Sequence, residues 1–465
     1  MDSNLLKSIM GNKLMLDFPQ MKLIPHVLNS LNKEHEGSGF IKQNQDGTIS
    51  LKMYCKGNVS PVEAFYQTKA TAGKIYDESY FYSILAWDIY GREWESKWLM
   101  PDFKFGPAES GYVIDATVRE VKYSAKLAQE MKAYYAGIYF SGEIEIPSNT
   151  RTKIDKIING QKRAAEVNFN IAKFTSSNFE FEVEKETDWL ALNVISDAGA
   201  IKYETAMRFN EALQFVLART LSWSALELIE GRTRTVRIKS CYRNKKQANN
   251  NPPLHFQNFD YQNRVWKLFD KFLCHVVNYE NDTWPAIFNW IHAVIESSNS
   301  SVDTQALILC VAVEGVLKDE FCSLSADISQ LKTQIDKTKK IIKESDLQPD
   351  FKKRLNGMFS AMLQPRAKDN LHILKQKKII RTKLIKEYDK LRNSSAHGEV
   401  ADISKLQEHI DRCDAVLTLF YNLIFLAINY TGEYTDYSEH GFPTKKFDAT
   451  LGTPVLSTTS RTHRG

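Results

Sequence analysis

The sequence lacks a hydrophobic run long enough to cross a membrane. Its most apolar stretch, residues 416–430, is shorter than the ~20 residues that a spanning helix needs, and it contains Asn422 and Asn429. The first residues also lack the basic flank and apolar run of a signal peptide. We therefore expect a cytoplasmic protein with no membrane partner, and we interpret 416–430 as a core helix.

The sequence has few residues in the spacings that metal sites and nucleotide sites require. Its 6 cysteines are far apart, so buried, reduced thiols are a better interpretation than a zinc or redox motif. The 10 histidines are scattered, and no glycine-rich loop ends in Gly-Lys-Ser or Gly-Lys-Thr. These absences argue against a metal-dependent hydrolase and against nucleotide hydrolysis, and we expect no cofactor.

Composition and length indicate a folded protein with more than one domain. The 465 residues are 43% hydrophobic and 25% charged, which is typical of soluble globular chains, and the length suggests two or three domains. The net charge is only +5, but residues 331–390 hold 17 Lys and Arg against 7 Asp and Glu. That excess of 10 exceeds the whole net charge, so the rest of the chain is mildly acidic.

Residues from about 48 to 240 show strand patterns. Polar and apolar residues alternate in short runs, many of them rich in aromatics. These runs cover residues 48–55, 80–87, 137–146, 167–171, 179–183 and 234–242. A helical period over 205–221 interrupts them. The pattern predicts a mostly antiparallel sheet or sandwich with one packed helix.

The polar segment 244–253, which ends in Pro252 and Pro253, is the best candidate boundary. Beyond it the sequence predicts only helices. They cover residues 262–278, 285–297, 304–322, 325–345, 350–363, 370–391 and 403–429. The fold class is therefore α+β, with an amino-terminal β-rich domain followed by an all-α helical bundle.

We accordingly divide the chain into five segments. They are a β-rich sensor or regulatory domain (1–243), a linker (244–255), connecting helices (256–300), a helical catalytic domain (301–432) and a carboxy-terminal tail (433–465).

The chemistry-bearing constellation lies between the last two long predicted helices. There Arg392 and Asn393 are followed by small residues and by His397, so we expect a tight turn over 392–397. A guanidinium can hold a scissile phosphate, and an imidazole can transfer a proton near neutral pH. The pair Arg366 and His372 has similar spacing, but it precedes a helix start and we rank it far lower.

The Arg-Asn-x-x-x-His motif between the last two long helices of an all-α domain resembles the HEPN fold of bacterial antiviral and toxin ribonucleases, and most closely the Apea-like group. Family members also carry a glutamate within an earlier apolar helix, which corresponds here to Glu314. Leu307, Cys310, Val311, Leu317 and Phe321 share roughly one face with Glu314, so we expect its carboxylate to be at least partly buried and paired with Arg392 or Asn393.

Each motif residue also has a structural interpretation. Glu314 either acts in catalysis or only orients Arg392 through a salt bridge. Arg392 and His397 are either catalytic or a helix-terminal cation beside a turn histidine. Asn393 either positions phosphate or simply ends the helix. Some HEPN domains are inactive scaffolds, so a noncatalytic dimerisation or RNA-binding domain with a ligand- or protein-sensing β domain is the alternative function.

The resemblance implies an endoribonuclease that needs no metal and acts in anti-phage defence by abortive infection. It implies attack by the ribose 2′-hydroxyl, structured RNA such as tRNA as substrate, a homodimer or higher oligomer, and a phage-derived trigger. The basic stretch either follows the RNA backbone toward the site or forms a solvated helix face. Its candidate RNA-binding residues are Lys375, Lys378, Arg381 and Lys390.

Overall fold

The structure is a computed structural model, and it contains two compact units. It describes residues 1–28, 33–57, 77–105, 111–158, 161–241, 248–257, 259–260, 262–277, 284–321, 324, 329–362, 367–396 and 403–452. Unit 1 comprises Met1–Asn210, Leu221–Gln247 and Gln257–Asn263, and unit 2 comprises Glu211–Thr220, Ala248–Phe256 and Arg264–Gly465. The chain therefore passes between the units several times.

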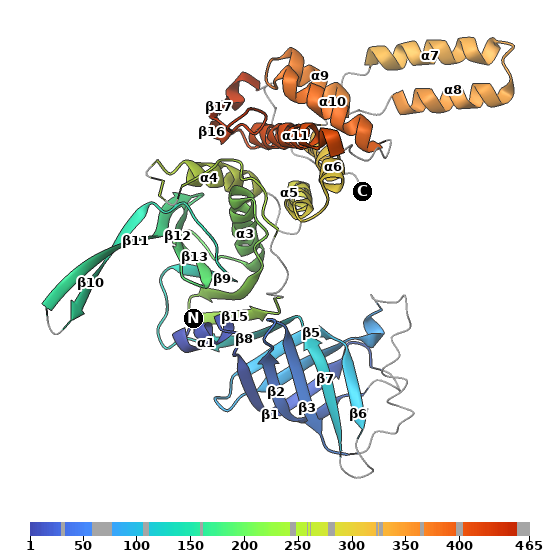
Figure 1. Cartoon of the computed structure of the whole chain (residues 1–465). Coiled ribbons are helices and arrows are strands. Elements are labelled where there is room, and N and C mark those ends of the chain that lie inside the picture. The colour runs from blue at the N-terminus through green and yellow to red at the C-terminus, as the bar shows by residue number, and fades with distance from the viewer. Residues whose placement is uncertain are drawn as a thin grey trace. The chain divides into compact units, whose positions relative to one another are not determined.

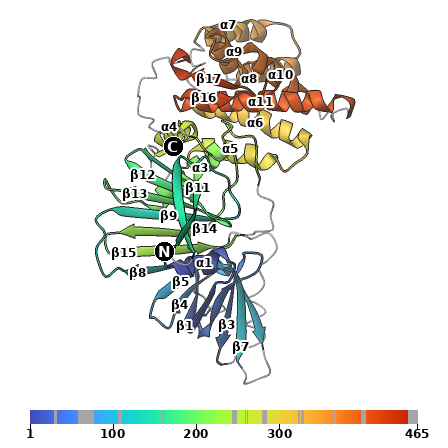
Figure 2. The same ribbon diagram turned by 60° about the vertical axis from the view of Figure 1, so that its left-hand side comes forward.

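Unit 1 is built on one antiparallel sheet (Figures 1 and 2). Its strands are β1 (Met15–Pro25), β2 (His35–Gln43), β3 (Ile49–Cys55), β4 (Tyr82–Trp87), β5 (Glu93–Leu99), β6 (Pro101–Phe105), β7 (Tyr112–Val118), β8 (Glu120–Lys126), β9 (Tyr134–Ser141), β10 (Thr150–Ile158), β11 (Gln161–Ser176), β12 (Phe179–Lys185), β13 (Trp189–Ser196), β14 (Trp223–Glu230) and β15 (Thr233–Lys239). Helix α1 (Ser3–Met10) and the first part of α3 (Tyr203–Leu217) belong to the same unit.

The sheet has two parts, which meet where β5 pairs with β8. The full order is β10-β11-β12-β13-β9-β14-β15-β8-β5-β4-β1-β2-β3-β7-β6. Strands β5 and β8 are joined at only two positions, Trp94 opposite Tyr123 and Glu95 opposite Lys122. The part from β1 to β7 contributes Trp94 and Phe18, whose rings meet edge to face at 6.3 Å, to a buried core that also includes residues of the other part, such as Val236 of β15.

The strands form where the sequence alternates, because alternate residues point to opposite faces. In β3, Ile49, Leu51, Met53 and Cys55 are buried while the residues between them are not. In the other part of the sheet, α3 covers one face, where Phe209 packs edge to face on Phe179 and Phe181. The predicted mostly antiparallel sheet with one packed helix is confirmed.

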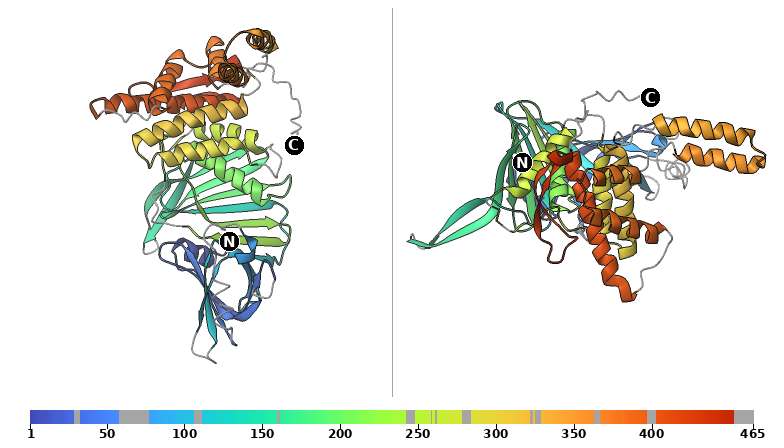
Figure 3. Two further views of the ribbon diagram at one scale, coloured as in Figure 1. Left: turned by 90° about the vertical axis from the view of Figure 1, so that its right-hand side faces the viewer. Right: turned by 90° about the horizontal axis from the view of Figure 1, so that it is seen from above.

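Unit 2 is mainly helical (Figure 3). Its helices are the end of α3, α4 (Arg264–Val277), α5 (Ala286–Ser297), α6 (Val302–Glu320), α7 (Ser329–Glu344), α8 (Pro349–Met362), α9 (Ala367–Gln376), α10 (Thr382–Ala396) and α11 (Leu406–Ala427). Short 3-10 turns are η1 (Glu78–Tyr80) in unit 1 and η2 (Ile403–Lys405) and η3 (Ala449–Gly452) in unit 2. Helix α11 is buried along most of its length and packs against both α6 and α10.

The helical predictions were wrong in three places. The predicted helix over 370–391 is two helices, α9 and α10, separated by a turn in which Lys378 adopts a positive φ of 57°. Helix α10 continues to Ala396, whereas a turn was expected from Arg392 onward. Residues that we expected to form a tail make a hairpin of β16 (Thr431–Thr435) and β17 (Thr444–Asp448).

Two further sequence expectations concern thiols and membranes. Five of the six cysteines lie in the described residues, and all five are free, with Cys55, Cys310 and Cys413 buried. Within the described ranges, no helix combines the length and apolar character needed to cross a bilayer.

Candidate functional site

Helices α6 and α10 bring the motif residues of unit 2 together. Glu314 lies in the second half of α6, and Arg392 lies in the last turns of α10. These two helices pack on each other and both pack on α11. On α10 the buried residues Leu384, Tyr388 and Leu391 recur at intervals of three and four, which turns one face to the bundle. Arg392 follows directly on that face and lies at its edge.

The carboxylate of Glu314 accepts two hydrogen bonds from α10. The Nε of Arg392 donates to its Oε1 at 2.5 Å, and the hydroxyl of Tyr388 donates to the same oxygen at 3.1 Å. The side chain of Arg392 is 50% exposed and that of Glu314 is 38% exposed, while Tyr388 is only 2% exposed. The expected pairing of a partly buried Glu314 with Arg392 is confirmed.

The electrostatics of this cluster follow from the shared carboxylate. The hydrogen bond and the charge of Glu314 raise the pKa of the Arg392 guanidinium above its usual value, so Arg392 is a permanent cation. Burial, together with the charge of Glu314, raises the pKa of the Tyr388 hydroxyl, which therefore stays protonated and can only donate to the carboxylate. Burial raises the pKa of the nearby Cys310 thiol to about 12, so Cys310 is not a nucleophile at neutral pH.

Gly315, next to Glu314 on α6, lies against the Trp290 ring of α5. A Cβ at this position would lie 2.2 Å from the Cε2 and 2.3 Å from the Cζ2 of Trp290, on α5. The Trp290 ring is itself held by a hydrogen bond of 2.8 Å from its Nε1 to Asp319 Oδ2 on α6. The glycine therefore allows α5 and α6 to approach closely next to Glu314.

The surroundings of Glu314 differ in part from the prediction. Cys310, Leu317 and Phe321 are buried as expected. Leu307 and Val311 are instead 46% and 44% exposed. Since positions 307, 311 and 314 follow one another at helical spacing, Glu314 lies on the border between the packed face of α6 and an apolar surface strip.

The other motif residues are less constrained by the structure. Asn393 is exposed on α10, and within the described residues no hydrogen bond connects it to Glu314. His397 lies outside the described residues, as does Arg366 of the lower-ranked pair, whereas His372 is exposed on α9. The predicted tight turn is wrong as far as Ala396, because these residues are helical and Arg392 and Asn393 lie within α10.

The four candidate RNA-binding residues have different environments. Lys375 is half-buried on α9, and Lys378 is exposed in the turn that follows. Lys390 Nζ contacts Glu387 Oε1 at 3.0 Å. Arg381 is engaged within the protein, since its Nη2 lies 2.7 Å from Asp436 Oδ2 and its Nη1 lies 3.1 Å from Glu439 Oε1. These contacts give Arg381 a structural role and disfavour it as a phosphate ligand.

Two polar groups at this end of the bundle were not found from the sequence. Tyr388 falls at helical spacing among apolar residues, as a core aromatic does. Nothing in the sequence indicated that its hydroxyl would bind Glu314. His409 is 7% exposed on α11, and its Nε2 lies 3.5 Å from Asp303 Oδ1 on α6. Its place among the buried residues of α11, most of which are apolar, was the one available signal.

Among the described residues, no group of three His, Cys, Asp or Glu side chains is arranged to hold a metal ion. Comparison with known proteins gave no family, no curated protein and no solved structure that matches this chain.

Proposed function

We propose that unit 2 is a metal-independent endoribonuclease of HEPN type that acts in anti-phage defence by abortive infection. The observation that supports this most directly is the half-exposed Arg392, a permanent cation held in place at the end of α10 by Glu314. A fixed guanidinium with an exposed side is suited to a phosphodiester. The role in defence, the toxin-like action and the phage-derived trigger come from the family resemblance alone.

The proposed reaction uses the substrate's own nucleophile. The ribose 2′-oxygen attacks the adjacent phosphorus and its proton passes to a base. The bond from phosphorus to the 5′-oxygen breaks, and the departing 5′-oxygen takes up a proton from the acid form of that base or from water. The products are a 2′,3′-cyclic phosphate and a 5′-hydroxyl end. We assign the phosphate contact to Arg392 and the proton transfers to His397, with Asn393 as a second phosphate contact.

Glu314 and Tyr388 are positioning residues in this proposal. Glu314 accepts through one oxygen from both Arg392 and Tyr388, and Arg392 contacts it through Nε. The exposed side of the Arg392 guanidinium can face a phosphate. Because Glu314 is already engaged by Arg392 and Tyr388, its geometry favours positioning over direct proton transfer.

A homodimer would complete the site. Leu307 and Val311 form an exposed apolar strip on α6 next to Glu314, and exposed apolar side chains beside a functional site favour a protein partner. A second copy related by a two-fold axis would cover the strip on both subunits and bring two Arg392 side chains to one RNA.

Cleavage of a synthetic RNA by the purified chain tests the chemistry. We expect cleavage in EDTA, no cleavage of the same strand with 2′-deoxy sugars, and 2′,3′-cyclic phosphate ends. Arg392→Ala and His397→Ala should each lower the rate about 100-fold or more. Lys386→Ala, which removes an exposed cation from the same helix, is the matched control and should leave the rate unchanged. Equal rates for wild type and the two motif variants would exclude this site.

Cell growth tests the biological role. Induced wild-type protein should arrest growth or protect the culture against phage, and His397→Ala should do neither. If both proteins behave alike with and without phage, the defence function is excluded even when cleavage is observed in vitro.

The second candidate function is a noncatalytic RNA-binding or dimerisation scaffold with a ligand- or protein-sensing β domain. The Arg392–Glu314 ion pair favours it, because a guanidinium that is already paired can be structural. RNA binding by wild type and Arg392→Ala alike, without cleavage by either, would select this function.

A further inference from the structure

Unit 1 contains a cavity on the face of its sheet opposite Phe209. Its volume is about 810 Å³, and strands β9, β11, β12 and β13 form its floor, with Leu6 of α1 at its edge. A cavity of this size matches small-molecule sites. It lies wholly within unit 1, so it is separate from the site on α6 and α10.

Three glutamates form a row along β12 within this cavity. Glu180, Glu182 and Glu184 occupy alternate positions, so they point to the same face and are about 7 Å apart. Strand register places Glu182 opposite Asn193 of β13 and Asn193 opposite Gly137 of β9. These three residues therefore lie side by side on the same face of the sheet.

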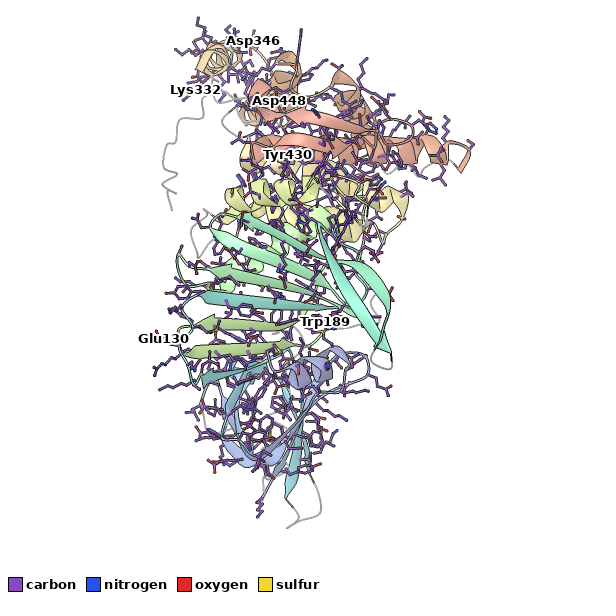
Figure 4. All side chains as sticks on the ribbon, turned by 90° about the vertical axis from the view of Figure 1, so that its left-hand side faces the viewer. Glu130, Trp189, Lys332, Asp346, Tyr430 and Asp448 are labelled. Carbon is purple, nitrogen blue, oxygen red and sulfur yellow. The ribbon has the colours of Figure 1, made fainter. Side chains whose placement is uncertain are left out.

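Aromatic rings form the other part of the floor. The Tyr135 hydroxyl donates to Asn193 Oδ1 at 2.7 Å and lies 3.3 Å from the Tyr139 hydroxyl. The rings of Tyr139 and Trp189 have centroids 6.0 Å apart, and Trp189 is labelled on the sheet in Figure 4. Gly137 leaves room for this arrangement, since a Cβ there would lie 2.6 Å from the Tyr135 hydroxyl oxygen.

The charge of the cavity is negative. Lys173 Nζ contacts Glu182 Oε2 at 2.5 Å, so one carboxylate of the row already holds an ammonium group. Within the described residues, no ion pair involves Glu180 or Glu184. Burial and the neighbouring Glu186 and Glu182 raise the pKa of Glu184, against a smaller opposing effect of Lys173. Anionic ligands such as nucleotides are therefore disfavoured here.

We propose that this cavity binds a linear aliphatic polyamine. The carboxylates of Glu180 and Glu184 lie on either side of the Lys173–Glu182 pair and can each accept an ammonium group, and Lys173 shows the contact that each ammonium would make. The rings of Tyr135, Tyr139 and Trp189 offer apolar and cation–π contacts to the methylene chain and its charges. This inference does not depend on the proposed ribonuclease.

Isothermal titration calorimetry of the full chain, freed of RNA and held in 150 mM KCl, tests the proposal with spermidine as the probe. We expect saturable binding at one site per chain. Glu184→Gln should weaken it about tenfold, between the effect of losing an exposed and a buried charge contact. Trp189→Ala should also weaken it.

Glu36→Gln is the matched control, because it removes the same charge from an exposed side chain of unit 1 outside the cavity. Circular dichroism checks that each variant folds, and Glu180→Gln, at an exposed position, replaces Glu184→Gln if the latter does not. Absence of saturable binding overturns the proposal, as do equal affinities for Glu184→Gln and Glu36→Gln. Displacement of spermidine by Mg²⁺ at equal charge concentration also overturns it, since the cavity would then be a site for cations in general.

Discussion

Replacement of Gly315 by alanine tests whether the close approach of α5 and α6 defines the helical unit. The new Cβ would lie 2.2 Å from the Trp290 ring, so the ring or the helix must move. Overpacking of this kind typically costs ~1–3 kcal/mol. Movement of the ring also breaks the Trp290–Asp319 hydrogen bond, at ~1 kcal/mol. Better helix propensity returns ~1 kcal/mol, so we expect a net loss of ~1–3 kcal/mol.

Gly357→Ala is the matched control for this prediction. Gly357 also lies within a helix, α8, but a Cβ there meets nothing within 4 Å. The same substitution should therefore gain up to ~1 kcal/mol from helix propensity alone. The two variants differ by no chemistry except the surroundings of the added methyl group.

Hydrogen–deuterium exchange read by mass spectrometry localises both effects. In Gly315→Ala, amides of α5 and α6 should exchange ~5–100-fold faster than in wild type, because 1.4 kcal/mol is a factor of ten. In Gly357→Ala, these helices should be unchanged and α8 should exchange more slowly. Unchanged or slower exchange of α5 and α6 in Gly315→Ala would refute the reasoning about Trp290.

Three further outcomes follow from the charges and thiols of unit 2. The hydrogen bond that His292 donates to Glu211 raises the pKa of His292 above 6.5. The stabilisation by this pair is therefore complete below pH 6.5 and is lost as the pH rises through the pKa of folded His292. The Tm of wild type should fall across this range more steeply than that of Glu211→Gln, and equal slopes would contradict this. Asp436 is buried, but the hydrogen bonds that its carboxylate accepts from Arg381, Lys445 and Ser438 outweigh desolvation and lower its pKa from 3.8 to about 2. The stability that this carboxylate contributes is therefore present above pH 3.8 and lost as the pH falls toward 2. Arg381→Ala should cost ~2 kcal/mol or more in urea unfolding, because it leaves that carboxylate short of a partner; no change would show that Lys445 suffices. Cys310, whose pKa burial raises to about 12, should not react with a thiol reagent until the protein unfolds, and rapid labelling of the native chain at this residue would count against its burial.

The sequence alone determined most of the local structure. The order of apolar residues along the chain determines which side chains can be buried together. This order alternates in Ile49–Cys55 and has a helical period in Leu406–Ala427, so both elements could be recognised. The same logic placed Glu314 within an apolar helix and required a partner for it. For this reason the α+β class and the Glu314–Arg392 pair could both be predicted.

Helix ends and short strands depended on tertiary contacts. No Gly or Pro marks the break between α9 and α10, where Lys378 takes a positive φ and Arg381 is bound by Asp436. The hairpin β16–β17 carries little apolar alternation and is held by contacts such as Phe447 with Phe425 of α11. Contacts between residues so distant in sequence cannot be read from a local pattern.

The finer features of both candidate sites were likewise decided by the tertiary structure. Periodicity assigned Leu307 and Val311 to a buried face, but the packing of α6 leaves them exposed beside Glu314. The cavity of unit 1 arises because Glu182, Asn193 and Gly137 come from three strands placed side by side by strand register. Sequence specifies which side chains share a face of one element, and only the assembly of elements specifies which faces meet and which remain open to a ligand.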